Sequence, residues 1–160
     1  MSYQPAGIEI AAALVPSQDV RDLVGELDLA LAGPYTPDQH HGLTVEDLFQ
    51  PHIRFFVASL NGVAVGCGGV ALCDGYAEVK RMYTRALVRG RGVARALLQR
   101  IQAEARGAEL AVLRLETGVY QHDSLRLYER AGFRRRGPFG LYADMPARAI
   151  ATSLFYEKMI

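Results

Sequence analysis

The sequence has 160 residues, half of them hydrophobic and 22% charged, which is ordinary for a globular protein. A chain of this length can bury about 70% of its unfolded surface in one core, so we predict a single domain over residues 1–160. The net charge of +1 excludes a global electrostatic attraction to nucleic acid or to an anionic membrane, and we predict neither as a partner.

The cysteines and the apolar segments indicate where the protein works. Cys67 and Cys73 lie in one predicted strand, about 20 Å apart, and are too distant to form a disulfide with each other. No apolar run reaches the length of about 18 residues that a membrane helix needs, and the N-terminus lacks the pattern of a signal peptide. We therefore predict reduced thiols and a cytoplasmic location.

The chain begins with a predicted strand and helix. Residues 7–15 are apolar and short, which indicates a strand, and Ser17 offers an N-cap for a helix that continues to about residue 32. Residues 44–47 could open a short second helix. The core stripe of the first helix consists of leucines spaced four residues apart: Leu23, Leu27 and Leu31.

Three antiparallel strands and a strand–helix–strand unit are predicted next. Residues 53–60 and 63–72 are rich in β-forming residues and are joined by Asn61-Gly62, a strong hairpin signal, and residues 76–84 form the third strand. Apolar residues at helical spacing predict a helix over residues 92–106. Gly107 is expected to cap that helix, and residues 110–115 form a buried strand.

The last part of the chain is predicted to contain one short helix and two short strands. Residues 124–131 read as a helix ended by Gly132, residues 133–136 as a strand, and residues 153–159 as a final strand. The alternation of strands and helices predicts an α/β fold.

The turn at residues 89–94 carries the clearest chemical signal. Glycines precede a helix start there, where free main-chain N–H groups and the positive end of the helix dipole bind phosphate. Arg89 and Arg91 add positive charge at the same place. The alternative is that the glycines serve only the chain geometry and the arginines are solvated.

Two sequence blocks resemble the GNAT superfamily of N-acetyltransferases. The first is Arg89-x-x-Gly92-x-Ala94, and the second runs from Gln121 and Ser124 to the Tyr128-Glu129-x-x-Gly132-Phe133 segment, about 30 residues later. The resemblance implies the GNAT fold, a mixed and mostly antiparallel sheet of six to seven strands flanked by about four helices.

The resemblance also implies acetyl-coenzyme A (acetyl-CoA) as the cofactor, with its pyrophosphate in the glycine turn. Gln121 and Ser124 stand where the family usually has Asn and Ala. The implied cofactor-binding residues are Met82, Tyr83, Thr84, Arg89, Gly90, Arg91, Gly92, Val93, Ala94, Gln121, Ser124 and Tyr128.

Tyr128 and Glu78 are the predicted catalytic residues. The matching tyrosine of many family members protonates the leaving thiolate, which a phenol can do, whereas a core tyrosine at helical spacing is the alternative. Glu78 is the leading candidate for the base that takes the proton of the amine. By strand alternation it should share a face with Lys80, Met82 and Thr84. A plain ion pair between Glu78 and Lys80 is the alternative.

Glu116, at the end of the next strand, is the reserve base, and its alternative role is to pair with Arg114. The main-chain N–H groups of residues 82–84 are expected to bind the acetyl carbonyl if the strands on either side diverge, as the resemblance implies.

No metal site is predicted, because the histidines fit no usual ligand spacing. His40 and His41 are expected to be solvated in the loop after the first helix. Three aromatic residues could line an acceptor pocket or pack in the core: Tyr35, Phe139 and Tyr142.

The sequence lacks the Gly-Lys-Ser/Thr of a P-loop and the three spaced glycines of a dinucleotide fold. We predict an acetyl-CoA-dependent N-acetyltransferase that acts on a primary amine of a small molecule, by direct attack in a ternary complex. The alternatives are a non-catalytic acyl-CoA sensor and a protein or peptide N-acetyltransferase. The resemblance also makes a homodimer possible.

Overall fold

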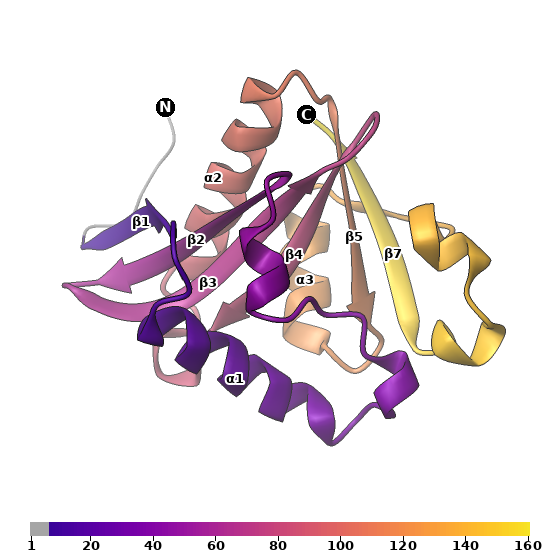
Figure 1. Ribbon diagram of the computed structural model, residues 1–160, viewed down its shortest axis with the longest axis horizontal. Coiled ribbons are helices and arrows are strands. Elements are labelled where there is room, and N and C mark those ends of the chain that lie inside the picture. Colours follow the sequence, from indigo (N-terminus) through magenta and orange to yellow (C-terminus); the bar gives the residue numbers. More distant parts are fainter. Residues whose placement is uncertain (1–6) are drawn as a thin grey trace.

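The computed structural model describes residues 7–160, which form one seven-stranded sheet with the strand order β1-β2-β3-β4-β5-β7-β6 (Figure 1). All neighbouring strands are antiparallel except β4 and β5. The predicted mixed, mostly antiparallel sheet is therefore confirmed. The strands are β1 (Ile8–Ala12), β2 (Ile53–Leu60), β3 (Val63–Leu72), β4 (Ala77–Thr84), β5 (Val112–Gly118), β6 (Arg134–Arg136) and β7 (Ser153–Met159).

Helix α1 (Gln18–Ala32) covers one face of the sheet, and α2 (Val93–Gly107) and α3 (His122–Arg130) cover the other (Figure 1). Residues 7–160 thus contain three α-helices, and the fourth expected helix is a 3₁₀ turn, η2 (Glu46–Phe49). The turn stops because Pro51 disfavours helical backbone at Gln50, which is extended. None of the helices in residues 7–160 could span a bilayer, since each is too short or too polar.

Ser17 caps α1 as predicted, because its side chain accepts a hydrogen bond from the backbone N–H of Val20 at 3.3 Å. The leucine stripe is only partly right. Leu27 and Leu31 are half-buried and line a pocket, because α1 extends past the core that its first half covers. The buried stripe is Val20, Leu23 and Val24.

The predicted hairpin and free thiols are present. Asn61 and Gly62 have φ values of 50° and 83°, as a two-residue hairpin turn requires. Cys67 and Cys73 are unpaired, and burial raises the pKa of the Cys67 thiol to about 12.

The end of α2 differs from the prediction. Gly107 is the last residue of the helix and not its cap, and the left-handed residue is Glu109, with φ 61°. The N–H of Leu110 bonds to the Ala105 carbonyl at 3.0 Å, which closes the helix beyond that left-handed position. Buried Ala105 holds the last turn against the sheet, so the helix includes Gly107 and is capped at Ala108.

Strand β4 contains a bulge that the sequence did not reveal. Its register with β3 shifts by one residue between the Cys67–Tyr83 and Gly69–Lys80 pairs, and Arg81 has φ 51°. Glu78 and Lys80 therefore face the side of α1, whereas Met82 packs in the core under α2. The prediction that these three side chains share one face is wrong, because the extra residue reverses the alternation.

Strands β4 and β5 pair over a short stretch and then diverge. Within residues 7–160 their register pairs are Ala77–Leu113 and Glu78–Arg114. The expected divergence is therefore present, and it leaves the later half of β4 without a ladder partner in β5. This opening in the sheet determines where the cavities lie.

Candidate active site

A cleft of about 1410 Å³ lies between the end of β4, the start of α2 and helix α3. Of the predicted cofactor residues, Arg91 is exposed and is absent from the walls of the cleft that residues 7–160 form. The cleft is lined by the other predicted cofactor residues, Met82, Tyr83, Thr84, Arg89, Gly90, Gly92, Val93, Ala94, Gln121, Ser124 and Tyr128.

The turn before α2 has the backbone of an anion site. Gly90 and Gly92 have φ values of 79° and 88°, and Gly92 is the N-cap of the helix. The first backbone bond of the helix runs from the Ala96 N–H to the Gly92 carbonyl at 3.0 Å, so the preceding N–H groups have no helical partner. The first turn carries no acidic residue. The free main-chain N–H groups at the start of α2 therefore suit a diphosphate.

The arginines near this turn have different roles. Arg81 pairs with Asp28 and Arg85 pairs with Glu26, so α1 neutralises both. Arg89 lines the cleft and donates from Nε to the Thr84 carbonyl at 3.1 Å. Arg95 of the same arginine cluster lines the cleft as well, and so do three cations that the sequence did not indicate: Arg126, Arg130 and Lys158.

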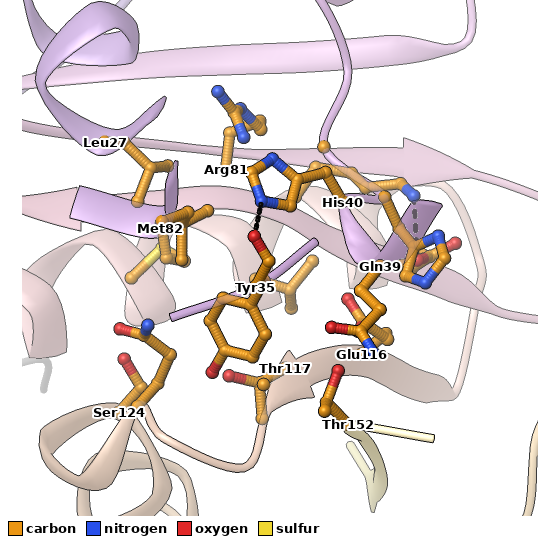
Figure 2. A pocket seen from close by; sticks show the side chains of 18 of the residues that line it. Leu27, Tyr35, Gln39, His40, Arg81, Met82, Glu116, Thr117, Ser124 and Thr152 are labelled. Atoms are coloured by element: carbon orange, nitrogen blue, oxygen red, sulfur yellow. Dashed lines mark hydrogen bonds and ion pairs between the residues drawn. The ribbon is translucent and has the colours of Figure 1, made fainter. Parts of the chain in front are cut away.

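A second, smaller pocket of about 120 Å³ lies on the α1 side of the sheet (Figure 2). Its walls come from α1, the loop after α1, β4, β5, α3, the 3₁₀ turn η4 (Gly140–Asp144) and the segment before β7. The pocket adjoins the cleft through shared lining residues: Leu27, Met82, Gln121, Ser124 and Tyr128.

Tyr128 lies where the two cavities meet and is only 5% exposed. Burial raises the pKa of its phenol, and the negative charge of Glu116 raises it further. The ring also packs edge-on against Phe133, with centroids 5.6 Å apart. The phenol is therefore protonated at neutral pH, and the residue has core contacts as well as a place in the site.

Glu78 is buried and bound on two sides. It forms an ion pair with Lys80 at 2.8 Å and accepts a hydrogen bond from the Tyr142 hydroxyl at 2.6 Å. Lys80 Nζ also donates to the Tyr142 hydroxyl oxygen at 3.1 Å. The ion pair between Glu78 and Lys80 is thus present. It engages the carboxylate that was predicted to act as the base.

Glu116 lines the same pocket and accepts one hydrogen bond, from Ser153 Oγ at 2.6 Å. Burial raises the pKa of its carboxyl above the usual range, and the charge of Glu78 adds to the rise. Arg114 instead pairs with Glu157 at 2.8 Å, so the alternative role of Glu116 as its partner is not seen.

The loop after α1 borders the pocket and is bonded to the segment between β5 and α3 and to the segment before β7. The Tyr35 hydroxyl accepts from the Tyr120 N–H at 3.0 Å, and the His41 ring donates from Nε2 to the Ala149 carbonyl at 2.7 Å. His41 is half-buried and lines the pocket, so the prediction of a solvated side chain is wrong for it. His40 is exposed, although it also lines the pocket and its Nε2 lies 3.3 Å from the Tyr35 carbonyl oxygen. The bond to Ala149, 108 residues away, gives no local sequence signal.

Of the three predicted aromatic residues, Tyr35 and Tyr142 line the pocket. Phe139 instead packs edge-on against Phe155 and Tyr142 in a separate small core. Among residues 7–160, no group of three or more His, Cys, Asp or Glu could hold a metal ion.

Comparisons with known proteins agree with this architecture. The acetyltransferase (GNAT) family model matches residues 23–133. An IAA acetyltransferase of Azospirillum brasilense is 47% identical over 146 residues, which cover 89% of this chain and 92% of that protein. A Klebsiella pneumoniae structure assigned as an acyl-CoA N-acyltransferase matches with a TM-score of 0.74 and 30% identity, over 95% of this chain and 97% of that one.

A GNAT acetyltransferase from Elizabethkingia anophelis, solved with acetyl-CoA bound, shares the fold, with a TM-score of 0.69 and 19% identity over 97% of this chain and 99% of that one. The chain described here belongs to the GNAT family of acetyltransferases, and the predicted family, fold and enzyme class are confirmed. The family uses acetyl-CoA, which confirms the predicted cofactor at that level.

Proposed function

We propose that this enzyme transfers an acetyl group from acetyl-CoA to the primary amine of a small molecule, by direct attack in a ternary complex. The observation that supports this most is that a large cleft and a small pocket adjoin at Tyr128, beside the opening between β4 and β5. Two substrates held in such adjoining cavities can react without a covalent enzyme intermediate.

The cleft residues fit acetyl-CoA, which supplies an activated acetyl thioester when bound. The free N–H groups at the start of α2 and the left-handed glycines at 90 and 92 suit its diphosphate. The unpaired edge of β4 at residues 82–84 offers N–H groups to a carbonyl oxygen. Arg91, which is exposed, remains a predicted cofactor contact.

Glu116 is the better-supported proton acceptor of the two predicted carboxylates. Glu78 is held by Lys80 and Tyr142, whereas Glu116 accepts only from Ser153 among the hydrogen bonds of residues 7–160. A raised pKa moves a carboxylate toward the range in which a base is effective at neutral pH. Glu116 thus takes the proton that an ammonium must lose before its nitrogen can attack.

Tyr128 is the proposed general acid. Its phenol stays protonated because burial and Glu116 raise its pKa, and it lines both cavities. It can therefore give a proton or a hydrogen bond to the thiolate that leaves.

A small acceptor suits a pocket of about 120 Å³ better than a folded protein does. The name of the Azospirillum relative also points to a small molecule. A peptide or protein amine would have to place only its end there, and the net charge of +1 gives no attraction to a charged polymer. A homodimer and a cytoplasmic location remain predictions.

Release of free coenzyme A from acetyl-CoA, measured across a panel of amines with mass spectrometry of the products, tests this function. We expect turnover with at least one small primary amine and an N-acetylated product. The intact mass of enzyme incubated with acetyl-CoA alone should stay unchanged, since direct attack forms no acetyl-enzyme. Turnover with peptides alone would contradict the small-molecule assignment.

A further inference from the structure

The junction of the two cavities is formed by the residues that line both of them: Leu27, Met82, Gln121, Ser124 and Tyr128. In the reaction proposed above, the thioester is held in the cleft and the amine in the small pocket, so the acyl group has to lie at this junction. Gln121, Ser124 and Tyr128 carry polar groups there. The alkyl end of the acyl group therefore meets apolar side chains at Leu27 and Met82.

Leu27 is the part of the junction that comes from α1. Its side chain is half-buried, yet it packs against none of the hydrophobic cores of residues 7–160. Met82 instead packs in the main core, and its sulfur lies in the space that a Cβ at Gly68 would take. The core thus explains the position of Met82, whereas the side chain of Leu27 shapes only the cavities.

The residues on either side of Leu27 are bonded to β4 and to the residue that follows it. Glu26 accepts from Arg85 through Nε at 3.1 Å and through Nη2 at 2.8 Å. Asp28 pairs with Arg81, whose side chain is 5% exposed. A bidentate arginine–carboxylate contact fixes the geometry of both partners. Because α1 is attached immediately before and after residue 27, the Leu27 side chain forms a fixed wall.

Figure 2 shows how this wall lies relative to the proposed base. Leu27, Met82 and Ser124 are on one side of the view, and Glu116 is on the other. The amine that Glu116 deprotonates therefore approaches from the side opposite Leu27. The alkyl end of the acyl group, which points away from the amine, is left to face Leu27 and Met82.

We propose, on the basis of the function proposed above, that Leu27 is a specificity-determining residue that restricts the acyl donor to acetyl-CoA. Its side chain, held by the ion pairs of Glu26 and Asp28, fills the space that the additional carbons of a propionyl or butyryl group need. One methylene in an apolar pocket changes kcat/KM by about tenfold or more. Propionyl-CoA and butyryl-CoA are therefore progressively poorer donors.

The leucines of α1 give a matched series of alanine variants. Leu27 lines both cavities, Leu31 lines only the small pocket, and Leu29, which is 78% exposed, lines neither. The measurement is kcat/KM for acetyl-, propionyl- and butyryl-CoA with the best amine of the panel. Leu27→Ala should raise the ratio of butyryl-CoA to acetyl-CoA about tenfold or more. Leu29→Ala should keep the wild-type ratio, and Leu31→Ala should raise KM for the amine at the same ratio.

The outcomes separate this inference from the proposed function. An unchanged ratio in Leu27→Ala, an equal shift in Leu29→Ala, or a wild type that uses both donors equally would overturn the role of Leu27 and leave the transferase function intact. Turnover of no amine would overturn the proposed function, and calorimetry then decides on Leu27 alone. The wild type should bind butyryl-CoA about tenfold more weakly than acetyl-CoA, and Leu27→Ala should bind both within about twofold. Equal affinities in the wild type would contradict the wall.

Glu26→Ala tests the attachment of α1 and does not depend on a change at residue 27. It removes the bonds from Arg85 and from the Tyr83 hydroxyl, and Glu26 itself lines neither cavity. The ratio of butyryl-CoA to acetyl-CoA should rise about threefold, as expected from the loss of a partly exposed ion pair. Asp22→Ala is the matched control, because Asp22 accepts from Gln18 of the same helix. A wild-type ratio in Glu26→Ala would contradict the role of the attachment.

Discussion

The two cavities are built in different ways. Within the cleft of about 1410 Å³, the proposed diphosphate site depends on main-chain groups of one continuous segment, the end of β4 and the turn at residues 89–94. The pocket of about 120 Å³ depends on side chains that seven separate parts of the chain bring together. The cofactor site is therefore largely a property of local sequence, whereas the acceptor site is a property of tertiary structure. Substitutions in the two regions should have separable effects.

The largest expected effect is that of Glu116→Gln, which removes the proposed base of the small pocket. We expect kcat to fall by about 100-fold or more, while the affinity for coenzyme A measured by calorimetry stays unchanged. The fall in rate at acidic pH should also disappear. Glu78→Gln is the comparison: a larger loss there, with Glu116→Gln nearly active, would return the role of base to Glu78.

Gly92→Val should act on the cleft alone. Its φ of 88° lies in the left-handed region, where a β-branched residue is strained, and the added side chain would stand beside the proposed phosphate site. We expect coenzyme A binding to weaken by about 30-fold by calorimetry. The control is Gly107→Ala, since a Cβ at Gly107 meets no atom within 4 Å. An unchanged affinity in Gly92→Val would mean that the turn does not hold the diphosphate.

Tyr128→Phe tests the boundary between the cavities. Without the phenol proton we expect kcat to fall by about tenfold, with less than a twofold change in coenzyme A affinity. The packing of the ring against Phe133 is kept, so the melting temperature should change little. Parallel losses of turnover and affinity would indicate that Tyr128 serves only packing.

Tyr35→Phe should give a smaller effect, confined to the acceptor. It removes the hydrogen bond from the Tyr120 N–H to the Tyr35 hydroxyl, a contact of 3.0 Å that attaches the loop after α1. One neutral bond is worth about 1 kcal/mol, so we expect KM for the amine to rise about threefold with KM for acetyl-CoA unchanged. Tyr120→Phe keeps that main-chain donor and should resemble the wild type.

The last expected effect concerns stability. Because the folded-state pKa of Glu116 is raised, its contribution to stability is full below the unfolded pKa and is lost as pH rises through the folded pKa. Glu116→Gln should therefore melt like the wild type below about pH 4.5 and at a higher temperature than the wild type at neutral pH. Thermal scans across this range measure the difference, and equal melting at every pH would contradict the burial argument.

The sequence was sufficient for features that a few neighbouring residues determine. Ser17 capped its helix, Asn61-Gly62 formed the hairpin, and the glycine turn at 89–94 opened onto the cleft. The bulge at Arg81 could not be predicted, since nothing in the residue type favours φ 51° there. Two tertiary contacts accompany that conformation: Arg81 pairs with Asp28, and the half-buried Met82 packs under α2.

The small pocket illustrates the same limit. His41 reaches Ala149, Tyr142 reaches Glu78, and Ser153 reaches Glu116, across separations of 37 to 108 residues. No periodicity or spacing motif connects such positions, so their proximity had to come from the fold. These contacts are the reason that Glu116, and not Glu78, is the proposed base.

The divergence of β4 and β5 also has a kinetic consequence. Because the small pocket lies on the α1 side of the sheet and most of the cleft lies beside α2 and α3, we expect each substrate of the proposed reaction to approach along its own route. Either one can then associate while the other is already bound, and neither product has to depart through the channel of its partner. Initial-rate lines at several fixed concentrations of the second substrate should accordingly intersect instead of running parallel.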